Sequence, residues 1–207
     1  AEELVIAAFV KVLYIRYPQK CIVLHIENNG RDLEEIDVSR TIGWFTSIYP
    51  VAFYVHEESF DALIKNVKET MRNVSHNRRF YSLFDSENDS TQVNHGIKLN
   101  YSGQAYFKTE YMEILSPIND DDTDENNIST YDLEVNIIIF MNQIYVNAVF
   151  DSRKYKTEQI QQLLAEFCEQ IADIVNYCIH KNTIAFTPSD FEALDITQEE
   201  LDSLFDE

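Results

Sequence analysis

The chain has few of the residues that interrupt or cross-link secondary structure: four Gly, four Pro and three Cys among 207 residues. So few glycines leave little scope for glycine-dependent phosphate loops and favour regular helices and strands. Three widely spaced cysteines exclude a disulfide framework and a Cys-rich zinc site, which suits a reducing cytosol. The five His are scattered without metal-ligand spacing, so no metal site is predicted.

Long apolar runs and basic residues are also scarce. No run approaches the ~20 residues that a membrane-spanning helix needs, and the amino terminus has no signal-peptide pattern, so we expect a cytoplasmic protein. Lys and Arg number 16 against 36 Asp and Glu, which gives a net charge of −20. Because such a surface repels phosphate backbones and anionic lipid, we expect neither nucleic acid nor a membrane as partner.

Hydrophobic residues make up 45% of the chain and aromatic residues 13%, enough for a buried core in one domain or two small lobes. Apolar periodicity predicts helices at 2–16, 58–74 and 157–180. Strands are predicted at 21–26, 47–55, 96–101, 104–110, 131–140 and 143–150, the last two as a hairpin. The first strand is apolar enough to be buried on both faces. This alternation predicts an α/β fold, a mixed sheet with the long helices packed on one face.

The tail differs in character from the rest of the chain. Residues 187–191 (Thr-Pro-Ser-Asp-Phe) break the pattern, and Thr197 with Glu200 forms a capping box that opens a last short helix. We therefore expect a domain over residues 1–184 and an exit linker with a short helix over residues 185–207.

Three motifs are not explained by secondary structure alone. Residues 27–32 read Glu-Asn-Asn-Gly-Arg-Asp, and residues 99–104 read Leu-Asn-Tyr-Ser-Gly-Gln. Between them, residues 37–51 contain Ile-Gly-Trp-Phe-Thr-Ser-Ile-Tyr-Pro-Val, with Trp44 the only tryptophan. No local rule of helix or strand formation demands these combinations.

In this order the motifs resemble signatures of nonribosomal peptide synthetases, in the epimerization branch of their condensation-type domains. The first is similar to the family's Glu-Gly-His-Gly-Arg-Glu motif, with Asn29 in place of His and Asp32 in place of the last Glu. The motif at 99–104 is similar to Phe-Asn-Tyr-Leu-Gly-Gln, with Ser102 as a departure. The tail after Thr187 also resembles the linker that leaves these domains.

The resemblance implies a fold and a site. The family's domain has two lobes of chloramphenicol-acetyltransferase-like fold around a tunnel, and this chain resembles the carboxyl-terminal lobe, a half domain. The implied catalytic residues are Glu27, Asn100 and Tyr101, with Glu27 as the carboxylate that moves a proton and the other two holding the thioester carbonyl. The residues implied to bind substrate are Asn29, Arg31, Trp44 and Ser102.

The resemblance also implies partners. The substrate arrives on the phosphopantetheine arm of a peptidyl carrier protein, and the chain itself binds no cofactor. The family's other, amino-terminal lobe carries a His-His-x-x-x-Asp motif, and no two His are adjacent in this sequence. We therefore expect that lobe as a partner and expect the isolated chain to be inactive.

Two other interpretations stay open. One is the same lobe of a condensation domain that forms peptide bonds, although Glu27, Trp44 and the Asn100-Tyr101 pair favour the epimerization branch. The other is a degenerate, non-catalytic lobe that binds carrier proteins. It is favoured by residues 75–83, where the family has a glycine-rich turn and this chain has Ser-His-Asn-Arg-Arg-Phe-Tyr-Ser-Leu. The Asp120, Asp122, Asp124 spacing mimics a calcium loop but lacks its Gly and final acid.

Overall fold

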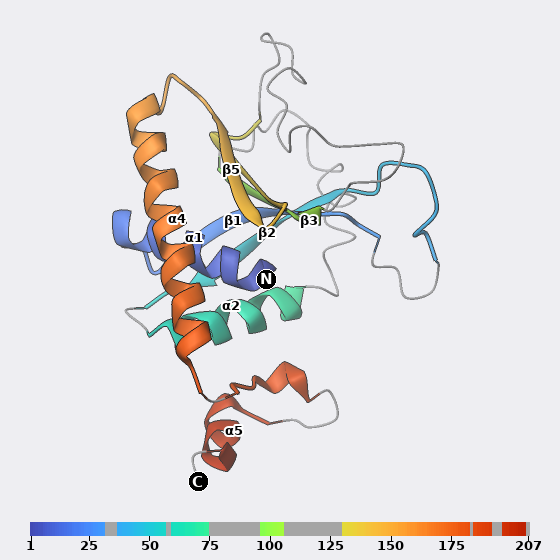
Figure 1. Ribbon diagram of the computed structural model, residues 1–207, viewed down its shortest axis with the longest axis vertical. Coiled ribbons are helices and arrows are strands. Elements are labelled where there is room, and N and C mark those ends of the chain that lie inside the picture. The colour runs from blue at the N-terminus through green and yellow to red at the C-terminus, as the bar shows by residue number, and fades with distance from the viewer. Residues whose placement is uncertain are drawn as a thin grey trace. The chain divides into compact units, whose positions relative to one another are not determined.

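The computed structural model describes residues 1–31, 37–56, 59–74, 96–105, 130–182, 184–191 and 196–205. Its helices are α1 (Glu2–Arg16), α2 (Phe60–Val74), α4 (Thr157–His180), the 3-10 helix η2 (Pro188–Asp190) and α5 (Gln198–Phe205) (Figure 1). Its strands are β1 (Cys21–Asn28), β2 (Ser47–Tyr54), β3 (Ile97–Ala105), β4 (Leu133–Phe140) and β5 (Gln143–Phe150).

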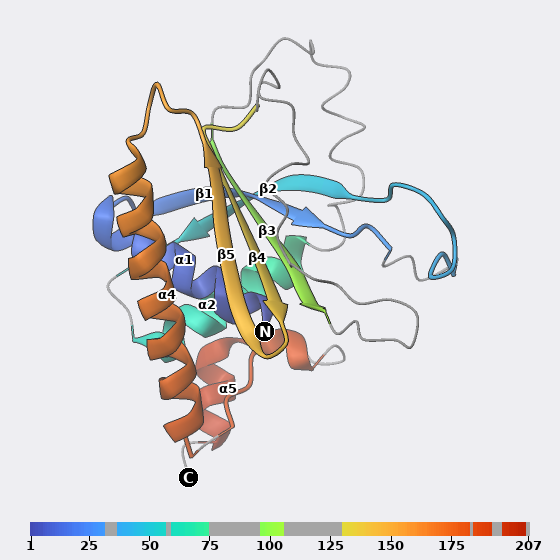
Figure 2. The ribbon, with the colours of Figure 1, turned by 45° about the horizontal axis from the view of Figure 1, so that its top comes forward.

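The strands form one sheet in the order β2-β1-β3-β4-β5. The β1–β3 and β3–β4 pairs are parallel, and the β4–β5 pair is antiparallel. Figure 2 shows β3, β4 and β5 side by side. The predicted α/β fold with a mixed sheet is therefore confirmed.

The chain divides into two compact units. A helical unit comprises residues 1–22, 51–77 and 165–207, and a sheet unit comprises residues 23–50 and 78–164. The predicted boundary between residues 184 and 185 stays a prediction.

The core of the helical unit is built around α1, whose residues from Val5 to Val10 are all buried. The Phe9 ring meets the Phe167 ring edge-on, with 5.0 Å between their centroids. At the carboxyl end of α1, the Arg16 guanidinium binds both carboxylate oxygens of Glu166 at 2.6 and 3.0 Å. The helix predicted from apolar periodicity is thus an anchored core element.

The strand β1 corrects one prediction. Ile22, Leu24 and Ile26 are buried, but Val23 is 49% exposed, and His25 and Glu27 are not fully buried. The strand is therefore covered on one face, not on both. An apolar run allows a strand to be buried on both faces, but it does not show that other elements cover the second face.

Two strands predicted separately, 96–101 and 104–110, are one. The strand β3 continues from Ile97 to Ala105, with a shift in its pairing to β4 between Tyr101 and Gln104. Gly103, at φ +77°, lies in this irregularity and absorbs it, as glycine does in a β-bulge. Residues 106–110 lie outside the described residues.

The predicted hairpin is confirmed. The strands β4 and β5 pair from Leu133 with Phe150 to Phe140 with Gln143. Met141 and Asn142 connect them, both at positive φ, 48° and 62°. This is the backbone conformation of the two-residue turn that suits the right-handed twist of paired strands.

The tail is held against α2 by polar contacts. The Asp190 carboxylate binds Lys68 at 2.5 Å and Arg72 at 2.8 Å, and it accepts the backbone N–H of Thr187 at 2.9 Å. Farther along the chain, Lys65 binds Asp202 at 2.9 Å. The predicted capping box is confirmed, since the Glu200 carboxylate accepts both the N–H and the hydroxyl of Thr197 at 2.9 Å.

These contacts predict a pH-dependent contribution from Asp190. Burial opposes its ionisation, but Lys68, the Thr187 N–H and Arg72 outweigh that effect and hold the pKa of Asp190 well below its usual range. A lowered pKa in the folded state stabilises the fold above the ordinary carboxyl pKa of ~4, and this contribution is lost as the pH falls through the folded-state value. Asp190→Asn should therefore cost about 1–2 kcal/mol at neutral pH, and the loss should shrink below about pH 4.

Urea unfolding at neutral and at acidic pH measures this difference. Asp173→Asn is the control, because Asp173 lies exposed on α4 and accepts a hydrogen bond of 3.2 Å from the Gln170 side chain, three positions away on the same helix. Equal unfolding free energies for Asp190→Asn and wild type at neutral pH would show that the contacts of Asp190 do not hold the tail.

Candidate functional site

The motif residues Glu27 and Asn100 lie on one face of the sheet unit, where the side chains form two adjacent rows. The first row, from β1 to β5, is His25, Lys98, Glu134 and Val149. The second row is Glu27, Asn100, Asn136 and Asn147. Because side chains alternate along a strand, residues two positions apart project from the same face. The parallel register of β1 and β3 therefore brings Glu27 beside Asn100, as the resemblance implies.

A lysine joins the two rows. The Lys98 ammonium lies 3.2 Å from a carboxylate oxygen of Glu27 and 2.6 Å from one of Glu134. All three side chains are mostly buried, with exposed fractions of 14% for Lys98, 19% for Glu27 and 18% for Glu134. Burial works against the charge of Lys98, but the bond to Glu134 and the charges of both carboxylates outweigh it and raise the pKa of Lys98. We call Glu27, Lys98 and Glu134 the charged triad.

Amide groups extend the second row. The Asn100 side chain donates a hydrogen bond of 3.3 Å to the Asn136 side-chain oxygen. The side-chain oxygen of Asn147 is buried and has no hydrogen-bond partner within the described part of the chain. The row thus places the Glu27 carboxylate next to groups that can donate and accept hydrogen bonds.

An aromatic pair borders the first row. The rings of His25 and Tyr131 meet edge-on with 5.2 Å between centroids, and the Tyr131 hydroxyl lies 3.4 Å from Nδ1 of His25. The Lys98 ammonium lies 5.7 Å from the centroid of the Tyr131 ring. These rings shield one side of the lysine.

Tyr101 lies on the other face of the sheet. It pairs with Ile137, so by alternation it belongs with Leu99 and Val135 on the opposite face from Glu27 and Asn100. Ser102 is exposed and lies within the irregularity that follows. The structure brings together only two of the three predicted catalytic residues along the regular part of the sheet. The roles of Tyr101 and Ser102 stay predictions.

Arg31 organises the loop that carries Trp44. Its guanidinium donates hydrogen bonds to the carbonyl oxygens of Val38, Thr41 and Gly43, at 2.6, 2.9 and 3.1 Å. The same group lies over the Phe45 ring, 4.4 Å from its centroid. Asn29, exposed, accepts the Arg31 backbone N–H at 3.0 Å. These contacts give Arg31 and Asn29 a structural part in the loop, and substrate binding by either stays a prediction.

The loop holds two large apolar side chains in the open. Trp44 is 90% exposed and Ile42 fully exposed. Since Arg31 fixes the carbonyls on both sides of Ile42, the exposure belongs to an organised segment. Apolar side chains held out in this way are typical of contact surfaces.

Gly30 is required where this loop begins. Its φ is +65°, and a Cβ there would stand 1.7 Å from the carbonyl oxygen of Phe45. Gly30→Ala should therefore cost roughly 2–4 kcal/mol of unfolding free energy, measured by urea denaturation. Gly103→Ala is the matched control, because Gly103 has φ +77° but no atom within 4 Å of its added Cβ. It should cost only the conformational strain of about 1–2 kcal/mol, and equal losses in the two variants would refute a steric requirement at Gly30.

Four residues of the two rows belong to none of the sequence motifs: Lys98, Glu134, Asn136 and Asn147. A signal was present: Lys98 and Asn100 in one predicted strand, and Glu134 and Asn136 in another, are polar residues at alternate positions among apolar ones. Such alternation marks a polar face. Their neighbourhood with Glu27 depends on strand order, which the alternation does not reveal.

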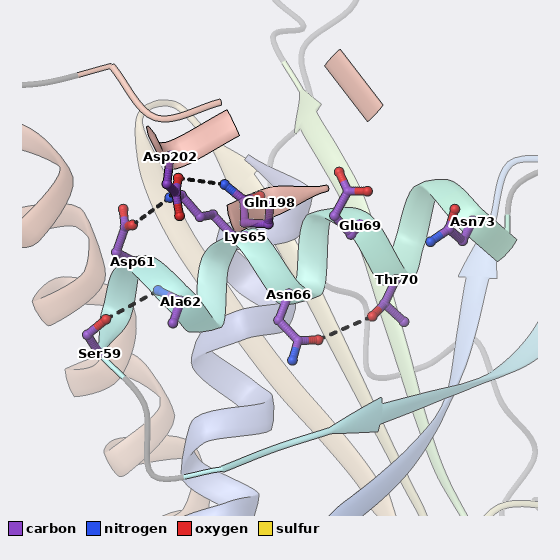
Figure 3. Close-up of a pocket in the computed structure, with 10 residues that line it drawn as sticks. All are labelled: Ser59, Asp61, Ala62, Lys65, Asn66, Glu69, Thr70, Asn73, Gln198 and Asp202. Carbon is purple, nitrogen blue, oxygen red and sulfur yellow. Dashed lines mark hydrogen bonds and ion pairs between the residues drawn. The ribbon is translucent and has the colours of Figure 1, made fainter. Parts of the chain in front are cut away.

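A separate pocket of about 460 Å³ lies in the helical unit. It is lined by α2 and by Gln198 and Asp202 of α5 (Figure 3). Lys65 reaches Asp61 at 3.1 Å and Asp202 at 2.9 Å along its wall. None of the predicted site residues lines this pocket.

Some predicted features lie outside the described residues: Asp32, the turn at 75–83, and the Asp120, Asp122, Asp124 spacing. Within the described ranges, no three His, Cys, Asp or Glu residues are grouped as a metal site requires. No described helix has the length and apolar character needed to span a membrane.

Comparison with known proteins gives consistent matches. A family model described as "Condensation domain" matches residues 1–197. Tyrocidine synthase 1 of Brevibacillus parabrevis is 31% identical over 206 residues, which cover 89% of this chain and 19% of that protein. Gramicidin S synthase 1 of Brevibacillus brevis is 28% identical over 205 residues, with the same shares covered.

Solved structures match as well. The epimerization domain from the third module of tyrocidine synthetase B gives a TM-score of 0.73 at 23% identity, over 87% of this chain and 42% of that one. The first condensation domain of the CDA synthetase gives 0.59 at 19% identity, over 83% and 38%. At these identities the structures show a shared fold. The chain spans about a fifth of the two curated relatives, 19% of each.

Proposed function

Because the chain belongs to the Condensation domain family, we propose that it is the carboxyl-terminal lobe of an epimerization domain in a nonribosomal peptide synthetase. The parent domain inverts the α-carbon of an aminoacyl or peptidyl thioester, which a peptidyl carrier protein presents on its phosphopantetheine arm. The observation that carries the proposal is the position of Glu27, mostly buried beside Asn100 on one sheet face. Both residues belong to motifs that resemble those of the epimerization branch.

Inversion at an α-carbon requires two groups. One removes the proton, and the other delivers a proton to the opposite face. Glu27 supplies one of these groups. When the C–H bond breaks, its electron pair moves toward the thioester carbonyl, and the Asn100 amide is a hydrogen-bond donor suited to the charge that develops on that oxygen. The second proton-transfer group is expected from the amino-terminal lobe, where the family carries its His-His-x-x-x-Asp motif.

The competing functions differ in their products. A condensation domain would join the substrates of two loaded carriers through an amide bond. A degenerate lobe would bind carrier protein and change nothing chemically. The charged triad supports the first proposal over a degenerate lobe, because a mostly buried carboxylate held by a lysine is costly to keep without a function.

The test uses the intact parent with its carrier loaded with either stereoisomer of the aminoacyl group. After quenching and thioester hydrolysis, chiral chromatography should show the same mixture of stereoisomers from both starting points. A new amide formed with a second loaded carrier, without inversion, would establish condensation instead. Carrier binding without either product would establish the non-catalytic lobe.

A further inference from the structure

Lys98 is the least expected residue of the site, since none of the motifs assigns it a role. It stands on β3 two positions before Asn100, between a carboxylate of β1 and one of β4. Its distances are unequal, 2.6 Å to Glu134 and 3.2 Å to Glu27. Glu134 is therefore its closer partner, and Glu27 shares the remaining attraction.

We propose that Lys98, held by Glu134, is a positioning residue that orients the Glu27 carboxylate for proton transfer. This inference rests on the proposed function. A carboxylate accepts a proton from the α-carbon only when one of its oxygens is held within reach of that hydrogen. The ammonium at 3.2 Å fixes the Glu27 side chain.

The second carboxylate, Glu134, sets the net charge of the charged triad. The Lys98 ammonium interacts more closely with Glu134, at 2.6 Å, than with Glu27, at 3.2 Å. The charged triad, one ammonium and two carboxylates, carries a net charge of −1. When Glu27 accepts the proton, an O–H bond forms and the triad becomes neutral, so the step creates no net buried charge.

Within the described residues, two more side chains face Lys98. From β1, His25 stands opposite it in the register, and Tyr131, which precedes β4, lies 5.7 Å away. The residue of β5 that pairs with Glu134 is Val149, which is uncharged. The charges nearest Glu27 in the described part of the site are therefore Lys98 and, behind it, Glu134. Changing these two residues should move the pH dependence in opposite directions.

The experiment measures kcat/KM for inversion against pH in the whole parent domain. Lys98→Met removes the positive charge and leaves two carboxylates close together, so the acidic limb should move up by about one pH unit, a loss of ~10-fold on that limb. Lys98→Arg, which keeps the positive charge, should leave the acidic limb at its wild-type position. Glu134→Gln leaves Glu27 as the one carboxylate of the triad that attracts the Lys98 ammonium. The acidic limb of the pH profile should therefore move to lower pH, and the plateau value of kcat/KM should fall. A merely structural role would not produce opposite shifts.

Lys154→Met is the matched control. Lys154 also forms a lysine–carboxylate pair, with Asp132 at 2.6 Å, but it stands outside the two rows. The acidic limb of the pH profile of Lys154→Met should stay where it is in the wild type. Glu134→Gln is nearly isosteric, so it carries the test if Lys98→Met fails to fold.

The outcomes separate the two proposals. If Glu27→Gln inactivates the parent but the acidic limb of the pH profile stays in place in both Lys98→Met and Glu134→Gln, the role of Lys98 is overturned. The proposed function would still stand. Full activity in Glu27→Gln would overturn both. Opposite shifts with the control unchanged would establish the positioning role.

Discussion

Glu27→Gln in the parent synthetase is expected to slow stereochemical inversion by about 10²–10⁴-fold, the usual effect of losing one positioned acid or base. The amide of Gln occupies almost the same volume as the carboxylate but does not accept a proton at neutral pH. Because Glu27 alternates along β1 with the buried residues Leu24 and Ile26, it lies outside the apolar core, and the shape of the site should survive the change. The measurement is the rate at which a carrier-bound L-aminoacyl thioester approaches its equilibrium mixture of stereoisomers.

Glu169→Gln makes the same chemical change at an exposed position of α4 and is the control. It should leave the rate unchanged. Wild-type rates in Glu27→Gln would identify Glu27 as a structural partner of Lys98 and remove it from the chemistry.

The same variant bears on the condensation alternative. Amide bond formation does not require removal of the substrate's α-proton. In a condensation domain, the α-hydrogen of the substrate should therefore stay unexchanged both in wild type and in Glu27→Gln. In an epimerization domain, exchange of the α-hydrogen with heavy water should be fast in wild type and slow in the variant. Following deuterium uptake at the α-carbon by mass spectrometry thus distinguishes the two functions independently of chiral separation.

The helices and the hairpin were predictable because their signals are local. The apolar periodicity of residues 157–180 coincides with α4, and Met141-Asn142 connects β4 and β5 as predicted. The errors lie where a local pattern has two outcomes. Residues 96–101 and 104–110 were predicted as two strands, whereas Gly103 sits at positive φ within a continuous β3. The exposure of Val23 depends on which elements cover β1.

The candidate site was predictable only in part. The motifs led to Glu27 and Asn100, and the parallel register places them side by side. Neither motif contains Lys98 or Glu134, because their contact with Glu27 arises from strands that are neighbours in the sheet but distant in the sequence. For Arg31, the resemblance implied substrate binding, which stays a prediction, and the guanidinium also donates hydrogen bonds to the backbone of its own loop. A motif thus identifies which residues matter more reliably than what each one does.

The 207-residue chain alone should not invert an aminoacyl thioester at a rate above the uncatalysed background. Glu27 can remove a proton from one face of the α-carbon, but returning it from the same carboxylate restores the original configuration. Inversion needs a donor on the opposite face. By the family resemblance that donor is the paired-His motif, and these 207 residues contain no adjacent His.

The assay incubates the purified chain with a carrier loaded with one stereoisomer and follows both stereoisomers by chiral chromatography. The whole parent domain, at the same concentration, is the positive control. Adding the amino-terminal lobe as a separate polypeptide should restore inversion if the two lobes associate, and the Glu27→Gln chain should fail to restore it. Inversion by the wild-type chain alone would mean that a second proton donor lies within this lobe, and the assignment of the catalytic pair to two lobes would then be wrong.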